Sequence, residues 1–346
     1  MQNQNQERNR RLNAITIGGM AIWAALIIIT VACTSACGKE KMNTFKEPVI
    51  TYGAGRFVLD IPACMKFSGR YSVRTFDLKE DVWPVEDKQK VAQTTWEKIL
   101  TEIDQKKPPK GQNKVMIEAR EFSSTHKWCK SVFFYGDSYD GDRGDLSILL
   151  NSDMVGLWIT TYGEFTGKDF MYDKASDLVH AYRPPTSRFG RVQVLSGRDS
   201  FYLQYGAIDL PFEYSESVSV DFAGHPLDEK MLISVMTRVV EEDQKIGLLD
   251  RAASSLTLKM AKGLKIDKLR SGKRTVGGLK GEEILERFTD DGRVTLAFSW
   301  MHLGKKDSAH QPHIIIDMES QDGRPEEKLA LWDAVLDSMR PAGRGE

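Results

Sequence analysis

The C-terminal stretch of the chain, residues 275–341, has the pattern that most restricts the fold. Asp291-Gly292 separates two runs rich in aliphatic and aromatic residues, which indicates a tight hairpin turn. A third run, His313 to Met318, contains no Pro or Gly and predicts another strand. A helix should follow, because Pro325 suits the first helical position and apolar residues recur at helical spacing as far as Arg340-Pro341. The stretch therefore predicts a small antiparallel sheet with a helix against one face.

The rest of the chain predicts strands, a helix, more strands and a second helix, and this order occurs twice. Alternating or continuous apolar runs predict strands at Phe57–Ile61, Tyr71–Phe76, Val115–Phe122, Cys129–Tyr135, Leu146–Leu150, Val155–Tyr162, Phe201–Asp209, Tyr214–Phe222 and Met231–Arg238. Apolar residues at helical spacing predict helices that begin near Asp87 and Asp169, and a third across 246–260.

This repeated order predicts an α+β fold with two related domains, 49–185 and 186–346. Each half ends on Arg-Pro, at 183–184 and at 340–341. We expect each domain to be an antiparallel sheet packed with two helices, both of which cover the same face.

The N-terminus predicts export from the cytoplasm. Arginines at positions 8, 10 and 11 precede an apolar run from Leu12 to Ala32, the layout of a secretory signal that is also long enough to span a bilayer. Small residues before Cys37 resemble a bacterial lipoprotein cleavage site. We therefore interpret 1–37 as a signal, lipoprotein or membrane-anchor segment and 38–48 as a tether. Lipidation at Cys37 and an uncleaved anchor remain alternatives, and in both cases the domains are exported.

Only Cys64 and Cys129 remain in the predicted exported part. An oxidising compartment makes a disulfide between them one hypothesis. The alternative is two free thiols, because a free cysteine behaves as a small hydrophobe.

No familiar catalytic or metal-binding motif occurs in the sequence. The G-x-S-x-G, H-E-x-x-H, P-loop and dinucleotide-binding patterns are all missing. His310 and His313 form one close histidine pair, and the acidic loop 137–145 could suggest calcium, but its spacing does not match a calcium loop. We therefore predict a non-enzymatic protein without a metal or cofactor. The net charge of −1 and the lack of a basic stripe argue against nucleic acid as a partner.

Several runs resemble one known family, the periplasmic immunity proteins that neutralise lipase effectors of type VI secretion systems, in the fourth lipase class. The resemblance lies in Gly-Leu-Lys-Gly-Glu-Glu (278–283), Phe-Ser-Trp (298–300), Pro-His-Ile-Ile-Ile-Asp-Met (312–318), the helix of residues 331–340, and Gly-Arg-Phe-Val-Leu-Asp-Ile-Pro (55–62).

This resemblance implies a protein of the Gram-negative periplasm, associated with the membrane, whose two domains grip a cognate toxic phospholipase and block the access of lipid. The partner-binding residues are not identifiable from the sequence. Two other hypotheses remain: an exported envelope lipoprotein with a scaffold or sensor role, and an exported hydrolase without a recognisable motif.

The two interpretations of the N-terminus differ in a measurable way. Lipidation at Cys37 predicts that the full-length protein incorporates labelled palmitate in a bacterial host and that Cys37→Ser abolishes the label. An uncleaved anchor predicts no label in either protein. A label that persists in Cys37→Ser would contradict Cys37 as the attachment site.

Overall fold

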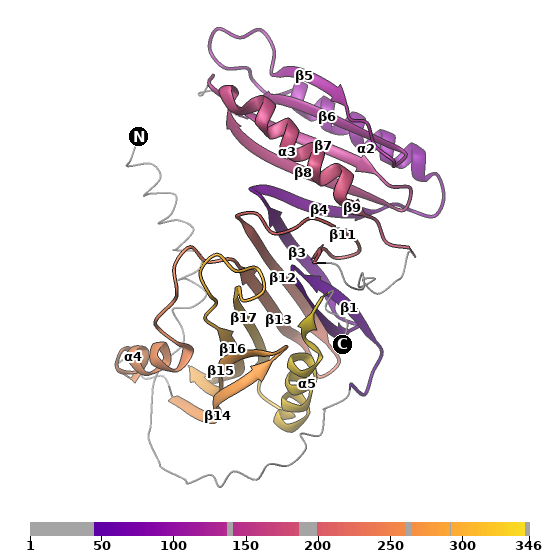
Figure 1. Ribbon diagram of the computed structural model, residues 1–346. Helices are drawn as coiled ribbons and strands as arrows, with labels where there is room; N and C mark the ends of the chain where they lie inside the picture. The colour runs from indigo at the N-terminus through magenta and orange to yellow at the C-terminus, as the bar shows by residue number, and fades with distance from the viewer. Residues whose placement is uncertain (1–44, 137–140, 187–198, 261–264, 291, 343–346) are drawn as a thin grey trace.

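A continuous antiparallel sheet of twelve strands forms the centre of the structure (Figure 1). The computed structural model describes residues 45–136, 141–186, 199–260, 265–290 and 292–342, with no side chains described for 255–260. Across the sheet the strands are β14 (Lys265–Val276), β15 (Leu279–Asp290), β16 (Arg293–His302), β17 (His313–Gln321), β13 (Asp228–Arg238), β12 (Glu216–His225), β3 (Lys66–Val73), β4 (Phe76–Val82), β8 (Val155–Glu164), β7 (Arg143–Asn151), β6 (Trp128–Tyr135) and β5 (Met116–Glu121).

Among the described residues, two smaller sheets and four α-helices pack against this large sheet. The small sheets consist of β1 (Val49–Ala54), β2 (Phe57–Pro62) and β18 (Arg340–Pro341), and of β10 (Phe201–Tyr202), β11 (Ala207–Ile208) and β9 (Tyr182–Arg183). The helices are α2 (Lys88–Asp104), α3 (Lys168–Ala181), α4 (Leu248–Met260) and α5 (Pro325–Ser338), and a short 3₁₀ helix, Phe165–Gly167, precedes α3. The α+β class predicted from the sequence is confirmed.

One face of the large sheet is the main core. Along β12, for example, Val218, Val220 and Phe222 are almost completely buried. Helices α3 and α5 and the hairpin of β1 and β2 cover this face, and their apolar side chains join a single cluster with it. Each fully buried side chain of this size contributes about 1.5–3 kcal/mol to folding, so this face supplies most of the stability of the fold.

Helices α2 and α4 lie on the opposite face, near its two ends. Helix α2 packs through Trp96 on Leu149 and Phe134 in a separate apolar cluster. At the other end, the backbone N–H of Leu249 in α4 donates to Glu282, whose side chain points away from the face that α5 covers. The expectation that both helices of a half cover the same face is therefore wrong. Successive side chains of a strand point to opposite faces of the sheet, and each half has enough apolar side chains to pack a helix on each face.

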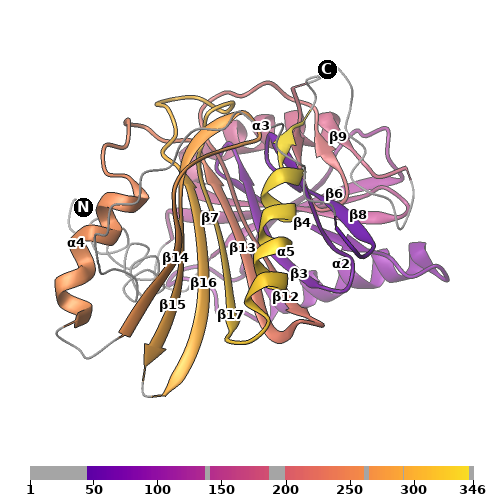
Figure 2. The same ribbon diagram turned by 90° about the horizontal axis from the view of Figure 1, so that it is seen from below.

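The two halves share the large sheet through β3 and β12. Eight residue pairs join these strands, from Glu216 opposite Val73 to Ala223 opposite Lys66. Strand β2 also pairs with β18 and packs on α5 (Figure 2). The boundary between 185 and 186 stays a prediction, but residues 49–73 contact mainly elements of the second half.

Two of the expected elements differ in detail, and two strands were not expected. The predicted strand Tyr71–Phe76 contains a two-residue turn, because Arg74 and Thr75 have φ values of 52° and 73°. Such turns usually carry Gly or Asn. Here Arg74 forms ion pairs with Asp177 and Glu213, at 3.1 and 2.8 Å, and these contacts hold the turn.

The predicted strand Phe201–Asp209 is two short strands, β10 and β11, connected by residues 203–206. Strand β14 was not predicted, because it is an edge strand with mostly exposed, charged side chains. Strand β1 was also missed. The turn at Gly277-Gly278, where φ is 55° and 80°, joins β14 to β15.

Arg56 connects the β1–β2 hairpin to β12 through a buried ion pair. Its Nε donates to Oε2 of Glu216 at 3.0 Å, and its Nη2 contacts the other carboxylate oxygen. Arg56→Met removes the partner of a buried carboxylate, so we expect a loss of about 3–5 kcal/mol in the free energy of unfolding. Urea denaturation measures this change. The exposed pair of Arg324 and Glu327 provides the control, and Arg324→Met should leave the free energy of unfolding nearly unchanged.

Candidate interaction surface

The middle of the α2 side of the sheet carries a broad surface that no described helix or strand covers, which we call the open face. It lies on β4, β3, β12, β13 and β17. Its members are side chains that alternate with the buried core residues: Ser68, Arg70, Ser72, Asp77, Lys79, Ser217, Ser219, Asp221, Leu232, Ser234, Met236, Ile315, Asp317 and Glu319.

The strand register proves that these side chains share one face. Directly opposed residues of neighbouring strands point to the same side of a sheet. Ser219 is opposite Arg70 on one neighbour and Met236 on the other. Met236 is opposite Ile315, which is opposite Met301 and, through it, Glu282 beside α4. The open face therefore runs without a break from the region of α2 to the region of α4.

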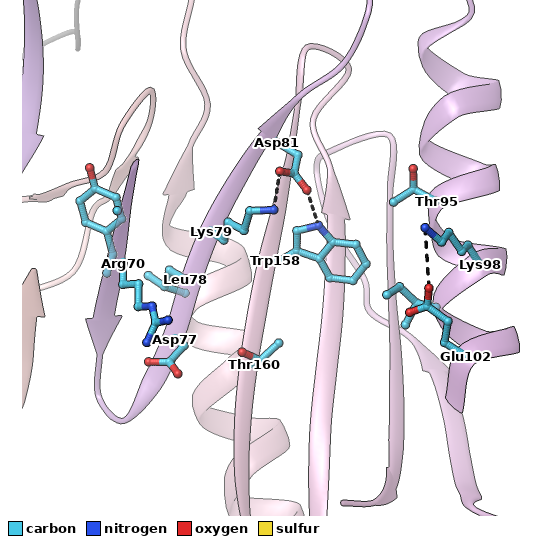
Figure 3. Close-up of a pocket in the computed structure, with 13 residues that line it drawn as sticks. Arg70, Asp77, Leu78, Lys79, Asp81, Thr95, Lys98, Glu102, Trp158 and Thr160 are labelled. Atoms are coloured by element: carbon cyan, nitrogen blue, oxygen red, sulfur yellow. Dashed lines mark hydrogen bonds and ion pairs between the residues drawn. The ribbon is translucent and has the colours of Figure 1, made fainter. Parts of the chain in front are cut away.

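A cavity of about 670 Å³ lies where the open face meets α2 (Figure 3). The indole of Trp158 forms part of its wall, and its Nε1 donates to Asp81 at 2.9 Å. Lys79 pairs with the same carboxylate at 2.8 Å. On the helix side, Lys98 and Glu102 line the cavity and lie 3.7 Å apart. An aromatic ring held by a hydrogen bond and surrounded by charged side chains resembles the centre of many protein interfaces.

The centre of the open face is acidic. The hydroxyl of Ser234 donates to Asp221 at 2.6 Å, and the hydroxyl of Ser299 donates to Asp317. Burial, aided by the charge of Glu319 and opposed by the hydrogen bond from Ser299, raises the pKa of Asp317 to about 6. A cationic side chain from a partner would stabilise this carboxylate in its charged form.

The two cysteines of the described chain do not form a disulfide. Cys64 is exposed in the turn before β3, whereas Cys129 is buried on β6, and both are free. Strand β6 is four positions from β3 in the sheet, roughly 19 Å at the usual strand spacing, and a disulfide allows at most about 7 Å between Cα atoms. Burial raises the pKa of Cys129 to about 12, so this thiol is a core residue of low reactivity.

The remaining residues singled out from the sequence lie apart from one another. His313 is buried at the start of β17, where its Nδ1 lies 3.2 Å from the carbonyl oxygen of Leu303. His310 is half-exposed, 3.3 Å from Asp199. Cys37 and residues 137–140 of the acidic loop lie outside the described residues. Over residues 45–342, in the parts that the structure describes, no helix is long and apolar enough to cross a membrane.

Sequence reasoning did not identify the open face. One signal was present: Ser217, Ser219 and Asp221 alternate with Val218, Val220 and Phe222 along β12. This alternation showed that one side of the strand is polar. The neighbouring strands that extend this side over a large area come from distant parts of the chain, so the area itself required the strand order.

The arrangement defines a class of protein, an α+β protein with one broad polar sheet face exposed between two helices, a shape that suits a protein partner better than a small molecule. The comparisons with known proteins agree with this class. Residues 201–342 match the family described as the Tle cognate immunity protein 4 C-terminal domain. The resemblance found in the sequence is thereby confirmed for this region. No curated protein matches the chain by sequence.

Solved structures of such proteins have the same fold. The apo structure of immunity protein TplEi of the T6SS from Pseudomonas aeruginosa has a TM-score of 0.69 and 18% identity, over 86% of this chain and 98% of that chain. A chain in the crystal structure of the Tle4–Tli4 complex has a TM-score of 0.69 and 17% identity, with the same coverage. TplEi complexed with "L" peptide has a TM-score of 0.62 and 17% identity. The shared fold extends over both halves.

The raised pKa of Asp317 predicts a dependence of stability on pH. Between pH 4 and pH 6 the unfolded chain loses this proton while the folded protein retains it, so the stability contributed by this group falls as pH rises through that range. Asp317→Asn should therefore gain about 2 kcal/mol over the wild type between pH 4 and pH 7. Urea unfolding at the two pH values measures the difference. Ser219→Ala, on the same face, should leave it unchanged, and an equal change in both variants would contradict the assignment.

Proposed function

We propose that this chain is an immunity protein that binds a type VI secretion lipase effector in the periplasm and blocks the access of lipid to the active site. The open face carries the proposal: it is large, polar, preformed and bounded by α2 and α4. The fold shared with TplEi and with a chain of the Tle4–Tli4 complex supports it.

The physical mechanism is steric. A stable protein–protein interface buries about 800 Å² on each partner, and a sheet face spanning several strands can provide such an area without rearrangement. Because the strands are hydrogen-bonded on both sides and backed by the core, little conformational entropy is lost on binding. The acidic centre favours a partner with cationic side chains, which increases the rate and the selectivity of association.

The proposal includes location and organisation. The proposed periplasmic location rests on the N-terminal segment, for which lipidation at Cys37 and an uncleaved anchor are the alternatives. Either would keep the open face close to the membrane that a lipase attacks. We also propose that the protein acts without catalysis, and that the parts on either side of residues 185–186 behave as two related domains that both contribute to the grip.

The decisive test is binding and protection. A lipase encoded next to the gene for this chain is the expected partner. The full-length protein should co-purify with that lipase, inhibit its phospholipase activity in stoichiometric amounts, and protect cells in which the lipase is directed to the periplasm. Failure to bind at micromolar concentrations would reject the proposal. Hydrolase activity of the chain itself would favour an enzyme instead, and a stable envelope complex without the lipase would favour a scaffold.

A substitution at the centre of the open face should separate binding from folding. Ser219 is exposed on β12, and Ser219→Arg adds a long side chain there while the core side of the strand stays intact. We expect the affinity for the lipase to fall by about 30-fold or more, the effect of losing an interface centre. Glu326→Arg, exposed at the start of α5 and outside the open face, is the matched control and should bind normally. Unchanged affinity in Ser219→Arg would place the interface elsewhere.

A further inference from the structure

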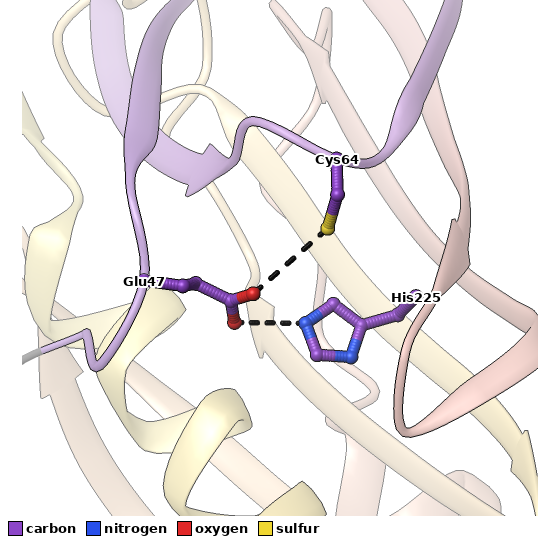
Figure 4. A group of neighbouring side chains, drawn as sticks. All are labelled: Glu47, Cys64 and His225. Carbon is purple, nitrogen blue, oxygen red and sulfur yellow. Dashed lines mark hydrogen bonds and ion pairs between the residues drawn. The ribbon is translucent and has the colours of Figure 1, made fainter.

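Three potential metal ligands from distant parts of the chain meet beside β1 (Figure 4). Glu47 lies in the segment that enters β1, Cys64 in the turn between β2 and β3, and His225 at the end of β12. One ligand atom of each lies within 4.8 Å of those of the other two. Figure 4 shows the thiol and the imidazole each facing a different oxygen of the carboxylate.

The distances approach those of a tetrahedral site. His225 Nε2 lies 2.8 Å from Oε1 of Glu47, and Cys64 Sγ lies 3.9 Å from Oε2. In a zinc site with bonds of about 2.0–2.3 Å, the ligand atoms are roughly 3.3–3.8 Å apart. Small rotations of the three side chains would therefore place them around one ion. A thiolate, an imidazole and a carboxylate are a donor set that suits zinc among the common divalent metals.

We propose that Glu47, Cys64 and His225 form a binding site for a zinc-like divalent cation, with a fourth position open to water. The side chain of His225 is only 4% exposed, which fixes its position, while Cys64 is exposed and gives the ion a route from solvent. A cavity of about 230 Å³, lined in part by Glu47 and His225, adjoins the group and leaves room for the water.

The protons balance as follows. In the structure the N–H of Leu227 lies 3.1 Å from Nδ1 of His225, so the ring carries its proton on Nε2 and donates it to Glu47. Zinc binds Nε2 in place of that proton, which transfers through solvent to Nδ1 so that the ring stays neutral. Nδ1 then no longer accepts from the N–H of Leu227, and that contact is lost as the ring turns. Cys64 releases its proton to solvent. Thiolate, carboxylate and Zn²⁺ then sum to zero charge, and the lost contact is the main cost.

A bound ion would link the segment before β1 to the turn between β2 and β3 and to the end of β12. Residues 45–48 connect the described structure to the N-terminal segment, and the bond between Glu47 and His225 already holds them against β12. A bound ion would strengthen this attachment without contact with the open face. The proposal is therefore independent of the proposed function.

Cobalt provides a direct test, because a thiolate ligand gives Co²⁺ an intense near-ultraviolet charge-transfer band. The full-length protein is purified in detergent with Cys33→Ser and Cys37→Ser, which removes the thiols of the N-terminal segment, and is titrated with Co²⁺ and then with Zn²⁺. We expect one equivalent of Co²⁺ to produce the band and Zn²⁺ to remove it. Affinity should rise about tenfold for each pH unit, because one proton is released for each ion bound.

Variants identify the ligands. Cys64→Ser should abolish the band, and His225→Gln and Glu47→Gln should each lower zinc affinity by about 100-fold or more, since even residues that only support metal ligands cost 10- to 100-fold. His310→Gln, a half-exposed histidine elsewhere, is the control and should bind normally. Circular dichroism confirms that each variant is folded. Absence of the band in the folded parent, or a band that survives Cys64→Ser, would overturn the proposal.

Discussion

The pairing of β3 with β12 is the interaction on which the rest of the structure depends. Without it, the strands before residue 185 and those after 200 would form two separate sheets, each with an exposed edge. Eight consecutive residue pairs convert these edges into the interior of one sheet. Because the hydrogen bonds of a sheet fix the spacing and twist of neighbouring strands, this pairing also fixes the orientation of α2 relative to α4. The open face extends across both halves only because β3 is paired with β12 along its whole length.

The two faces of the sheet have divided roles. The face covered by α3, α5 and the β1–β2 hairpin contains the aromatic and aliphatic core, including the contact between Phe298 and Trp332. The other face is apolar under α2 and near α4, and its middle carries mostly serines, aspartates and single cations. The strict alternation along β12 makes this division possible, since every second residue can change without disturbing the core. Stability and recognition can thus evolve separately on the same strands.

Much of the secondary structure could be predicted from the sequence because it depends on local signals. Pro325 and the helical spacing of Leu329, Trp332, Leu336 and Met339 predicted α5. The predictions failed where distant contacts override local preference. The turn at Arg74-Thr75 has no turn-forming residues and depends on acidic partners from a helix and a loop far along the chain.

Sites built across the fold were less accessible to prediction. The open face required the order of the strands, and Glu47, Cys64 and His225 are too far apart in the sequence to suggest a common site. Both sites depend on pairings between distant strands, such as β3 with β12, and no sequence motif marks such a pairing. The family resemblance added what local patterns could not, because motifs such as Phe-Ser-Trp and the final helix identified a known arrangement of the C-terminal part.

The three-stranded sheet of β1, β2 and β18 has a consequence for the order of assembly. Residues 49–62 find their partners in α5 and in Arg340-Pro341, which are synthesised nearly three hundred residues later. If the chain crosses a membrane from its N-terminus, this hairpin must wait on the far side until the final helix has emerged. Closure of this small sheet therefore depends on the arrival of residues 325–341 on the same side of the membrane, and until then the β1–β2 hairpin lacks β18 and α5 as partners.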